Sequence, residues 1–233
     1  MLRYGRIGGG LVALALLTGL VAATPASAAT PASADTSAAL AGNVLTYPTA
    51  GGTAVAVNDI IQASLKTGTN GTFYNSTSGT TGIKCAASSF SAKVLTNPIA
   101  PGTATESLTA QSFGSCTTNV FGTTGVQSIA LNNLPYATSV TSAGVVKISG
   151  TTAAPVQSTV VLSSLLGTIT CVYRTSTNSL TGAAVNTTNS ITFTNQPFTK
   201  FSGPSLCFGT AYFSATYSPV RDSTKGNAAV YVN

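Results

Sequence analysis

Apolar and polar residues alternate along most of the chain after residue 42. The period is two, and Ser or Thr usually supplies the polar position. Successive side chains of a β-strand point to opposite faces, so this pattern puts one face on a core and the other in water. The alternating stretches are 43–48, 53–58, 83–96, 104–113, 125–133, 137–150, 157–173, 189–198 and 211–218. They predict an all-β domain of about ten strands, folded as an antiparallel β-sandwich or jelly-roll-like structure.

One stretch departs from the alternation and favours a helix. In "VNDIIQASLK", residues 57–66, Asn58 or Asp59 can cap one or two turns whose isoleucines and Leu65 face inward. We therefore expect at most one short helix in the protein.

The last 23 residues read as a hairpin. Residues 211–218 alternate, Pro219 and Gly226 are turn residues, and "NAAVYVN" returns as a final strand. Arg221, Asp222 and Lys225 fall on the connection between the strands. The pattern predicts a solvated tip for these three charges rather than a working site.

The first residues have the three parts of a secretory signal peptide. Arg3 and Arg6 give a basic start, 11–23 is an apolar run, and Ala26-Ser27-Ala28 is a small-x-small cleavage site. The run is shorter than the roughly 18 residues that a membrane-spanning helix requires. We expect three parts: a signal peptide (1–28), a flexible leader (29–42) and a disulfide-bonded β domain (43–233). The mature chain is then secreted without a transmembrane segment, and is either released or retained at the cell envelope.

Four cysteines, Cys85, Cys116, Cys171 and Cys207, remain in the predicted mature chain. An even number in an exported protein indicates disulfides, and four cysteines allow three pairings. Spacing favours Cys85 with Cys116 and Cys171 with Cys207, because the separations are similar. Each second cysteine also follows a similar phrase, "SLTAQSF" or "SITFTNQPF". These likenesses suggest two related halves, 43–150 and 151–233.

Charge argues against nucleic acid as a partner. The formal net charge is +6, but the six lysines are scattered singly instead of forming the cluster that nucleic-acid binding requires. They are Lys66, Lys84, Lys93, Lys147, Lys200 and Lys225.

The residue types needed for common chemistries are also missing. The chain has four carboxylate side chains and no histidine. A Ser–His–Asp triad and a Cys–His pair are therefore excluded, because histidine is the base in both. No CxxC spacing, Asp-rich calcium loop or phosphate-binding Gly-Lys pair occurs. We expect no enzyme activity, no cofactor and no metal site.

The phrases "NSITFTNQPFTKFSGPSLC", "AYFSATYSPVRDSTKGNAAVYVN" and "LNNLPY" resemble those of secreted actinobacterial proteins of unknown function, which are labelled mainly by their export signal. The resemblance covers most of the predicted mature chain. It implies export and a shared all-β fold, and it carries no activity or site residues.

Two function classes fit these observations. The first is an extracellular structural or interaction protein with a partner outside the cell or in the cell envelope. The second is a ligand-binding module for a glycan or an apolar small molecule. Glycan sites use exposed aromatic rings, and the chain has no Trp, so Tyr47, Tyr74, Tyr136 and Tyr173 are the candidates. A concave pocket lined by several of them favours the second class.

We expect the secreted protein to begin at Ala29, because the Ala26–Ala28 site directly follows the apolar run. N-terminal sequencing of the protein from culture medium tests this. Cleavage at the second small-x-small site would make Asp35 the first residue, and a start at Met1 would contradict export.

Overall fold

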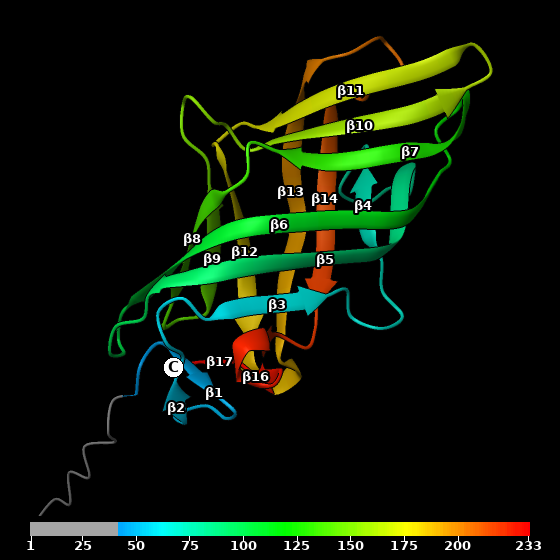
Figure 1. Ribbon diagram of the computed structural model, residues 1–233. Helices are drawn as coiled ribbons and strands as arrows, with labels where there is room; N and C mark the ends of the chain where they lie inside the picture. The colour runs from blue at the N-terminus through cyan, green and yellow to red at the C-terminus, as the bar shows by residue number, and fades with distance from the viewer. Residues whose placement is uncertain (1–41) are drawn as a thin grey trace, which may run out of the picture. The chain divides into compact units, whose positions relative to one another are not determined.

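Residues 42–233 are described here from a computed structural model (Figure 1). The chain divides into two units, 1–37 and 38–233, and every described residue belongs to the second. The predicted signal peptide, and the predicted leader except for residue 42, lie outside the described residues. Within 42–233, no helix has the length and apolar character needed to cross a membrane.

The described residues form seventeen β-strands and two 3-10 turns, so the prediction of an all-β fold is confirmed. The expected number of about ten strands is too low. Several of the additional strands have only two or three residues, and an alternation this short leaves no recognisable signal in the sequence.

Eight antiparallel strands close into a barrel in the order β5-β6-β8-β9-β12-β13-β14-β4, with β4 returning to β5. The barrel strands are β4 (Gly71–Tyr74), β5 (Gly82–Thr96), β6 (Thr103–Thr118), β8 (Tyr136–Thr141), β9 (Val145–Ser149), β12 (Ser179–Val185), β13 (Ser190–Ser202) and β14 (Thr210–Tyr217). A closed ladder leaves no free edge among these strands. This closure is the difference from the two packed sheets of a sandwich.

Three further strands extend the sheet beyond the barrel: β7 (Thr123–Asn132), β10 (Gln157–Ser164) and β11 (Gly167–Thr175). They join through β11, which pairs with the second half of β13, whereas β12 pairs with the first half. The pairing of β13 with β14 is irregular between Phe193 and Gln196, where Asn195 has a positive φ of 47°. In Figure 1, β7 lies beside β6, β10 and β11 follow beyond β7, and the three strands cross β13.

Short strands from both ends of the described region cover one end of the barrel (Figure 1). They are β1 (Leu45–Tyr47), β2 (Thr53–Ala54), β3 (Ile60–Ser64), β15 (Arg221–Asp222), β16 (Ala228–Ala229) and β17 (Tyr231–Val232); the 3-10 turns are η1 (Asn186–Thr188) and η2 (Ser223–Lys225). The amide of Asn97 holds β1 by accepting from Leu45 N and donating to Leu45 O, each at 2.8 Å. The Leu45 carbonyl also accepts from Val55 N at 3.0 Å, so both backbone polar groups of Leu45 are paired.

The barrel interior is filled mainly by aromatic rings. Alternate residues of β14 are buried, as its sequence predicts, and Phe213 lies 5.0 Å from Phe73 between ring centroids. Phe73 also meets Phe113 edge-on at 5.4 Å. Such contacts add to the area that these rings bury.

Glycine 82 is required where β4 meets β5. Its φ of 151° lies outside the range that L-residues usually adopt, and a Cβ there would collide with the Phe73 carbonyl oxygen. Gly82 pairs with Tyr74 at the end of the short ladder that closes the barrel. A side chain at this position would push β4 away from β5.

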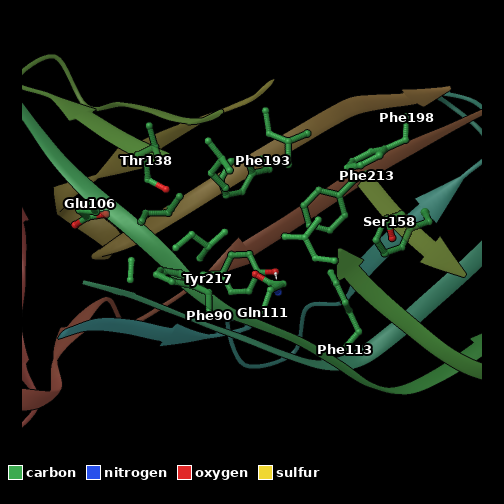
Figure 2. A pocket seen from close by; sticks show the side chains of 18 residues that line it. Phe90, Glu106, Gln111, Phe113, Thr138, Ser158, Phe193, Phe198, Phe213 and Tyr217 are labelled. Atoms are coloured by element: carbon green, nitrogen blue, oxygen red, sulfur yellow. Dashed lines mark hydrogen bonds between the residues drawn. The ribbon is translucent and has the colours of Figure 1, made fainter. Parts of the chain in front are cut away.

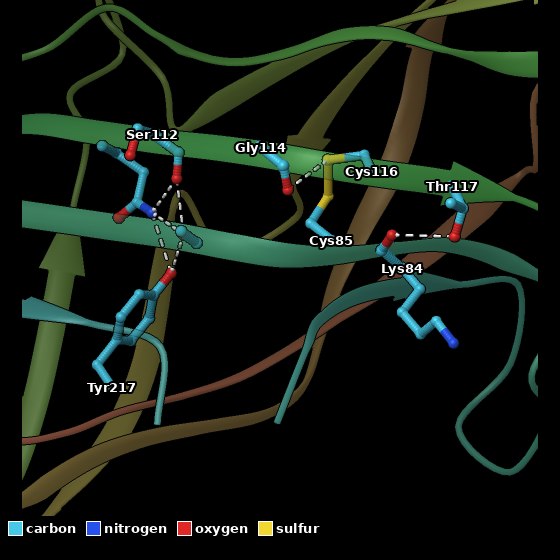
Figure 3. The surroundings of a disulfide bond; sticks show 9 residues. Lys84, Cys85, Ser112, Gly114, Cys116, Thr117 and Tyr217 are labelled. Carbon is cyan, nitrogen blue, oxygen red and sulfur yellow. Dashed lines mark hydrogen bonds between the residues drawn. A yellow bond between two sulfur atoms is a disulfide. The ribbon is translucent and has the colours of Figure 1, made fainter. Parts of the chain in front are cut away.

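Both disulfides have the predicted pairing, Cys85–Cys116 and Cys171–Cys207. The first joins residues directly opposite each other on β5 and β6 (Figure 3). The second ties β11 to the loop that follows β13. The barrel takes strands from both of the proposed halves, and their relationship stays a prediction.

The expected helix at 57–66 is wrong, because these residues contain a turn followed by β3. Asn58 has a positive φ of 75°, which a right-handed helix does not allow, and the Asp59 carboxylate accepts from the Ala56 amide at 2.9 Å. β3 pairs with β5 and β15 on its two sides. Tertiary pairing has overridden the local helical pattern.

The prediction of a solvated tip is wrong for Asp222. Arg221 and Lys225 are exposed, but Asp222 is fully buried. Its Oδ1 accepts from the Thr224 amide at 2.9 Å and from the Thr224 hydroxyl at 2.6 Å, which caps η2. Lys225 forms an ion pair with Asp59 at 3.2 Å. Lys225 thus folds back onto the turn before β3, and Arg221 stays at the surface.

We expect Asp222→Ala to lower the free energy of unfolding by about 1 kcal/mol, through loss of the cap on η2. Asp222→Asn retains a side-chain oxygen that can accept from Thr224, and we expect it to lose less. Urea unfolding measures both. Arg221→Ser is the control and should stay within about 0.5 kcal/mol of the parent protein. Equal stability of Asp222→Ala and the parent would show that the cap contributes nothing.

Candidate functional site

The aromatic core of the barrel leaves a cavity of about 50 Å³. Its wall is mostly phenylalanine and aliphatic side chains, and every barrel strand contributes to it. Figure 2 shows Glu106 and Thr138 at one end, Ser158 and Phe198 at the other, and Phe193 and Tyr217 between them. This arrangement, an apolar wall with a few polar groups, is typical of small-molecule sites.

Glu106 is the one carboxylate that lines this cavity. It lies on β6 opposite Val94 of β5 and Thr138 of β8, and its side chain is buried. Among residues 42–233 its carboxylate has no hydrogen bond or ion pair. Burial alone therefore raises the pKa of the Glu106 carboxyl to about 7.

Two hydroxyl groups in the cavity wall also have no hydrogen-bond partner within the described residues. They are Thr138 Oγ1, which shares the register of Glu106, and Ser158 Oγ at the far end. By contrast, the Tyr217 hydroxyl accepts from Gln111 Nε2 at 3.0 Å and lies 3.0 Å from Ser88 Oγ (Figure 3). Unpartnered buried polar groups are costly, so Glu106, Thr138 and Ser158 have unused bonding capacity.

A second cavity of about 40 Å³ lies toward the covered end of the barrel. Phe90, Glu106 and Ile191 line both cavities, so Glu106 stands at the wall between them. The lining of the second cavity continues to Val185 and Asn186, which are exposed. This cavity leads from Glu106 toward the surface.

The four candidate tyrosines do not come together. Tyr136 is buried, and its hydroxyl donates to the Pro155 carbonyl at 2.7 Å. Tyr173 lines a separate cavity of about 20 Å³ between β10, β11 and the barrel, where burial raises its pKa to about 12. Tyr47 and Tyr74 lie on β1 and β4. None of the four lines the cavity at Glu106, so the aromatic platform expected for a glycan is not formed by them.

Arg221 borders a surface groove of about 300 Å³. Gln62, Ser64 and Ser91 are among its other lining residues, and the Arg221 guanidinium donates to the Asn227 carbonyl at 2.8 Å. No unpartnered buried side chain lines this groove among the described residues. It therefore offers less to anchor a ligand than the barrel interior does.

Basic and acidic side chains differ in their burial among the described residues. Of the ten Lys and Arg in the chain, Arg3 and Arg6 lie before residue 42, which leaves eight, and none of the eight is buried. Of the four carboxylate side chains, Asp35 lies before residue 42, and the remaining three, Asp59, Glu106 and Asp222, are all buried. The surface of residues 42–233 is thus cationic, with no exposed acidic side chain.

An apolar tip projects from the end of the β10–β11 hairpin. We define it as Phe121, Leu165, Leu166 and Leu206. Leu165 and Leu166 form the turn and are 91% and 101% exposed, and Phe121 is 93% exposed. The pairing of Thr123 with Ser164 places the loop that carries Phe121 beside this turn, and Leu206 lies against Gly122 of the same loop.

Hydrogen bonds between the Ser164 side chain and the backbone fix the hairpin turn that carries the two leucines. Ser164 Oγ donates to the Gly167 carbonyl at 2.8 Å and accepts from Leu166 N at 3.2 Å. Elsewhere, exposed Phe201 is covered by the Arg174 guanidinium, 3.4 Å from the ring centre. Turn positions normally carry polar residues, so two adjacent leucines there are unusual.

Two lysines flank the apolar tip. Lys84 of β5 pairs with Thr117, four residues before Phe121, and it is exposed. The Lys200 ammonium lies 3.5 Å from the Pro204 and Cys207 carbonyls, on the loop that carries Leu206. The tip is therefore apolar at its centre and cationic at its border.

Comparison with known proteins adds nothing to this geometry, since no family model, curated protein or solved structure matches the chain. Among the described residues, no cluster of three or more His, Cys, Asp or Glu could hold a metal ion.

Sequence reasoning did not single out Glu106 or the apolar tip. A signal for Glu106 exists, because it occupies an inward position of the alternation in "TATESLTA", where a carboxylate is out of place. A signal for the tip also exists in "SSLLGT", where apolar residues occupy the turn between two strands.

We expect Glu106 to make stability depend on pH. The Glu106 carboxyl has a pKa of about 7 in the folded state and an ordinary pKa of 4.5. As pH rises, the unfolded chain therefore loses this proton first, and the free energy of unfolding falls. Relative to Glu106→Gln, the protein should lose about 2.5 kcal/mol of unfolding free energy between pH 5 and pH 8. Urea unfolding of both proteins at the two pH values measures this. A constant difference would show that Glu106 ionises as freely as in water.

Proposed function

We propose that this protein is a non-catalytic extracellular interaction protein that attaches to an anionic lipid surface through its apolar tip. One observation carries the proposal. The apolar tip lies on a described surface whose ionisable side chains, tyrosine excepted, are all cationic. Apolar residues enter the boundary between headgroups and acyl chains, and lysines beside them meet anionic headgroups.

The geometry of the tip supports a lipid surface over a deep protein pocket. Leu165, Leu166 and Phe121 project fully from two neighbouring loops rather than lining a concave surface. A projecting apolar tip can insert into a bilayer while the strands behind it remain in water. Lys84 lies opposite Thr117, on the strand that leads to Phe121, and Lys200 binds the loop that carries Leu206, so both ammonium groups can meet anionic headgroups.

Two further observations support an extracellular and non-catalytic role. Both disulfides are formed, and such bonds persist in oxidising compartments. The chain also has no histidine. Of its described carboxylates, Glu106 lies alone in the barrel interior, and Asp59 and Asp222 are buried together beside Lys225 rather than paired across an open cleft.

Vesicle sedimentation tests the proposal. We expect the purified protein to sediment with vesicles that contain phosphatidylglycerol and to remain in solution with phosphatidylcholine alone, with salt weakening the binding. Leu165→Ser with Leu166→Ser should weaken binding at least about tenfold, since each buried leucine contributes roughly 1.5–3 kcal/mol.

The matched control is Ile99→Ser, which removes an isoleucine that is 64% exposed and lies outside the tip. It should bind as the parent protein does, and the double variant should keep the parent's urea midpoint. Unchanged binding by the double variant would overturn the proposal. So would a tip-dependent dimer in sedimentation velocity without vesicle binding, because the tip would then serve a second copy of the chain.

A further inference from the structure

The carboxylate of Glu106 lacks a counter-charge inside the barrel. The residues that line the two cavities around it include no Lys or Arg, and the other titratable side chain among them is Tyr217. Burial raises the pKa of Tyr217, which therefore stays neutral at ordinary pH. A cation brought in from outside would supply the missing counter-charge to an ionised Glu106.

The walls around Glu106 suit an organic cation. Phe90 and Ile191 line both cavities with Glu106, Thr138 lies opposite it with an unpartnered hydroxyl oxygen, and Phe193 follows along the larger cavity (Figure 2). A carboxylate and a hydroxyl can both accept from an ammonium group, and aromatic faces attract it. A calcium or magnesium ion would need several more oxygen ligands than these.

The size of the cavity limits the ligand to a few atoms. One water-sized group needs about 10–15 Å³ of such a cavity, so 50 Å³ accepts roughly three to five non-hydrogen atoms. The smaller cavity on the other side of Glu106 adds space of similar extent. A short alkyl chain can therefore lie along the phenylalanines while its charged end stays at Glu106.

The path to this site is covered by the final strands of the chain. Val230 and Val232 line the smaller cavity. Asn186 donates to the Val232 carbonyl at 2.7 Å and accepts from Val232 N at 3.0 Å, and Asn189 donates to the Val230 carbonyl at 2.7 Å. This segment is held at the mouth by these side-chain amides, by the short pairing of β17 with β1 and by Val230 N, which donates to the Val220 carbonyl at 3.0 Å; none of these bonds belongs to a barrel ladder.

We propose that the barrel interior is a binding site for a small primary alkylamine, with the ammonium at Glu106 and Thr138 and the alkyl chain against the aromatic core. The site is separate from the apolar tip and does not depend on it.

The protonation of Glu106 sets the pH dependence of this binding. The amine binds the ionised carboxylate, which forms as pH rises through the pKa of about 7, so affinity is higher above this pH than below it. Binding at pH 6 should be about tenfold weaker than at pH 8. An alkyl alcohol of the same size carries no charge and should show no such increase.

The experiment titrates the full secreted chain with n-propylamine, and with 1-propanol as the neutral match, and follows the NMR signals of residues around Glu106. We expect propylamine to shift these signals in a saturable way, about tenfold more tightly at pH 8 than at pH 6. Glu106→Gln, which keeps the shape of the side chain, should abolish this binding while it remains folded. Thr138→Val should weaken it.

Three results would overturn the proposal. The first is propylamine binding by Glu106→Gln equal to that of the parent. The second is an affinity that does not change with pH or does not differ from that of propanol. The third is the absence of saturable shifts, which would show that the cavity holds water only. Each is independent of vesicle binding, so this proposal and the proposed function can fail separately.

Discussion

The closure of the barrel by β4 is the constraint on which the rest of the structure depends. This strand of four residues pairs with β14 on one side and β5 on the other, and thereby joins the two ends of the ladder. Phe73 at its centre contacts Phe113, Phe198 and Phe213, which come from three other strands. Without β4, the sheet would have two open edges and its aromatic face would meet water.

Closure also explains why the interior holds both a cavity and a carboxylate. Eight strands enclose a space just wide enough for side chains to fill, and here the side chains leave about 50 Å³ of it empty. Glu106 must point inward because its position on β6 fixes its face, whatever its charge. The resulting cost to stability is reduced when the group is protonated, and it would also be reduced by a cationic ligand.

The two disulfides have different places in this architecture. Cys85–Cys116 reinforces the β5–β6 ladder next to the strand that closes the barrel. Cys171–Cys207 fixes the loop with Leu206 and Lys200 to β11, so it supports the base of the apolar tip. The tip and the covered mouth near Asn186 are built on different strands. The domain can therefore present an interaction surface and an interior site without one disturbing the other.

The sequence by itself determined the all-β class, because alternation with Ser and Thr is a local property of each strand and needs no partner to be recognised. It also favoured, among three possible cysteine pairings, the one that the structure shows. The order of strands, the closure at β4 and the pairing of Ile60–Ser64 as a strand were decided only by tertiary contacts, which a local pattern does not contain. The same holds for the charges. Asp222 reads as a loop residue, yet it is buried because η2 folds back on β3. The pKa of Glu106 is raised only because the closed barrel buries its carboxyl. A side chain's burial depends on what packs over it, and for both carboxylates the covering segments are distant in the sequence.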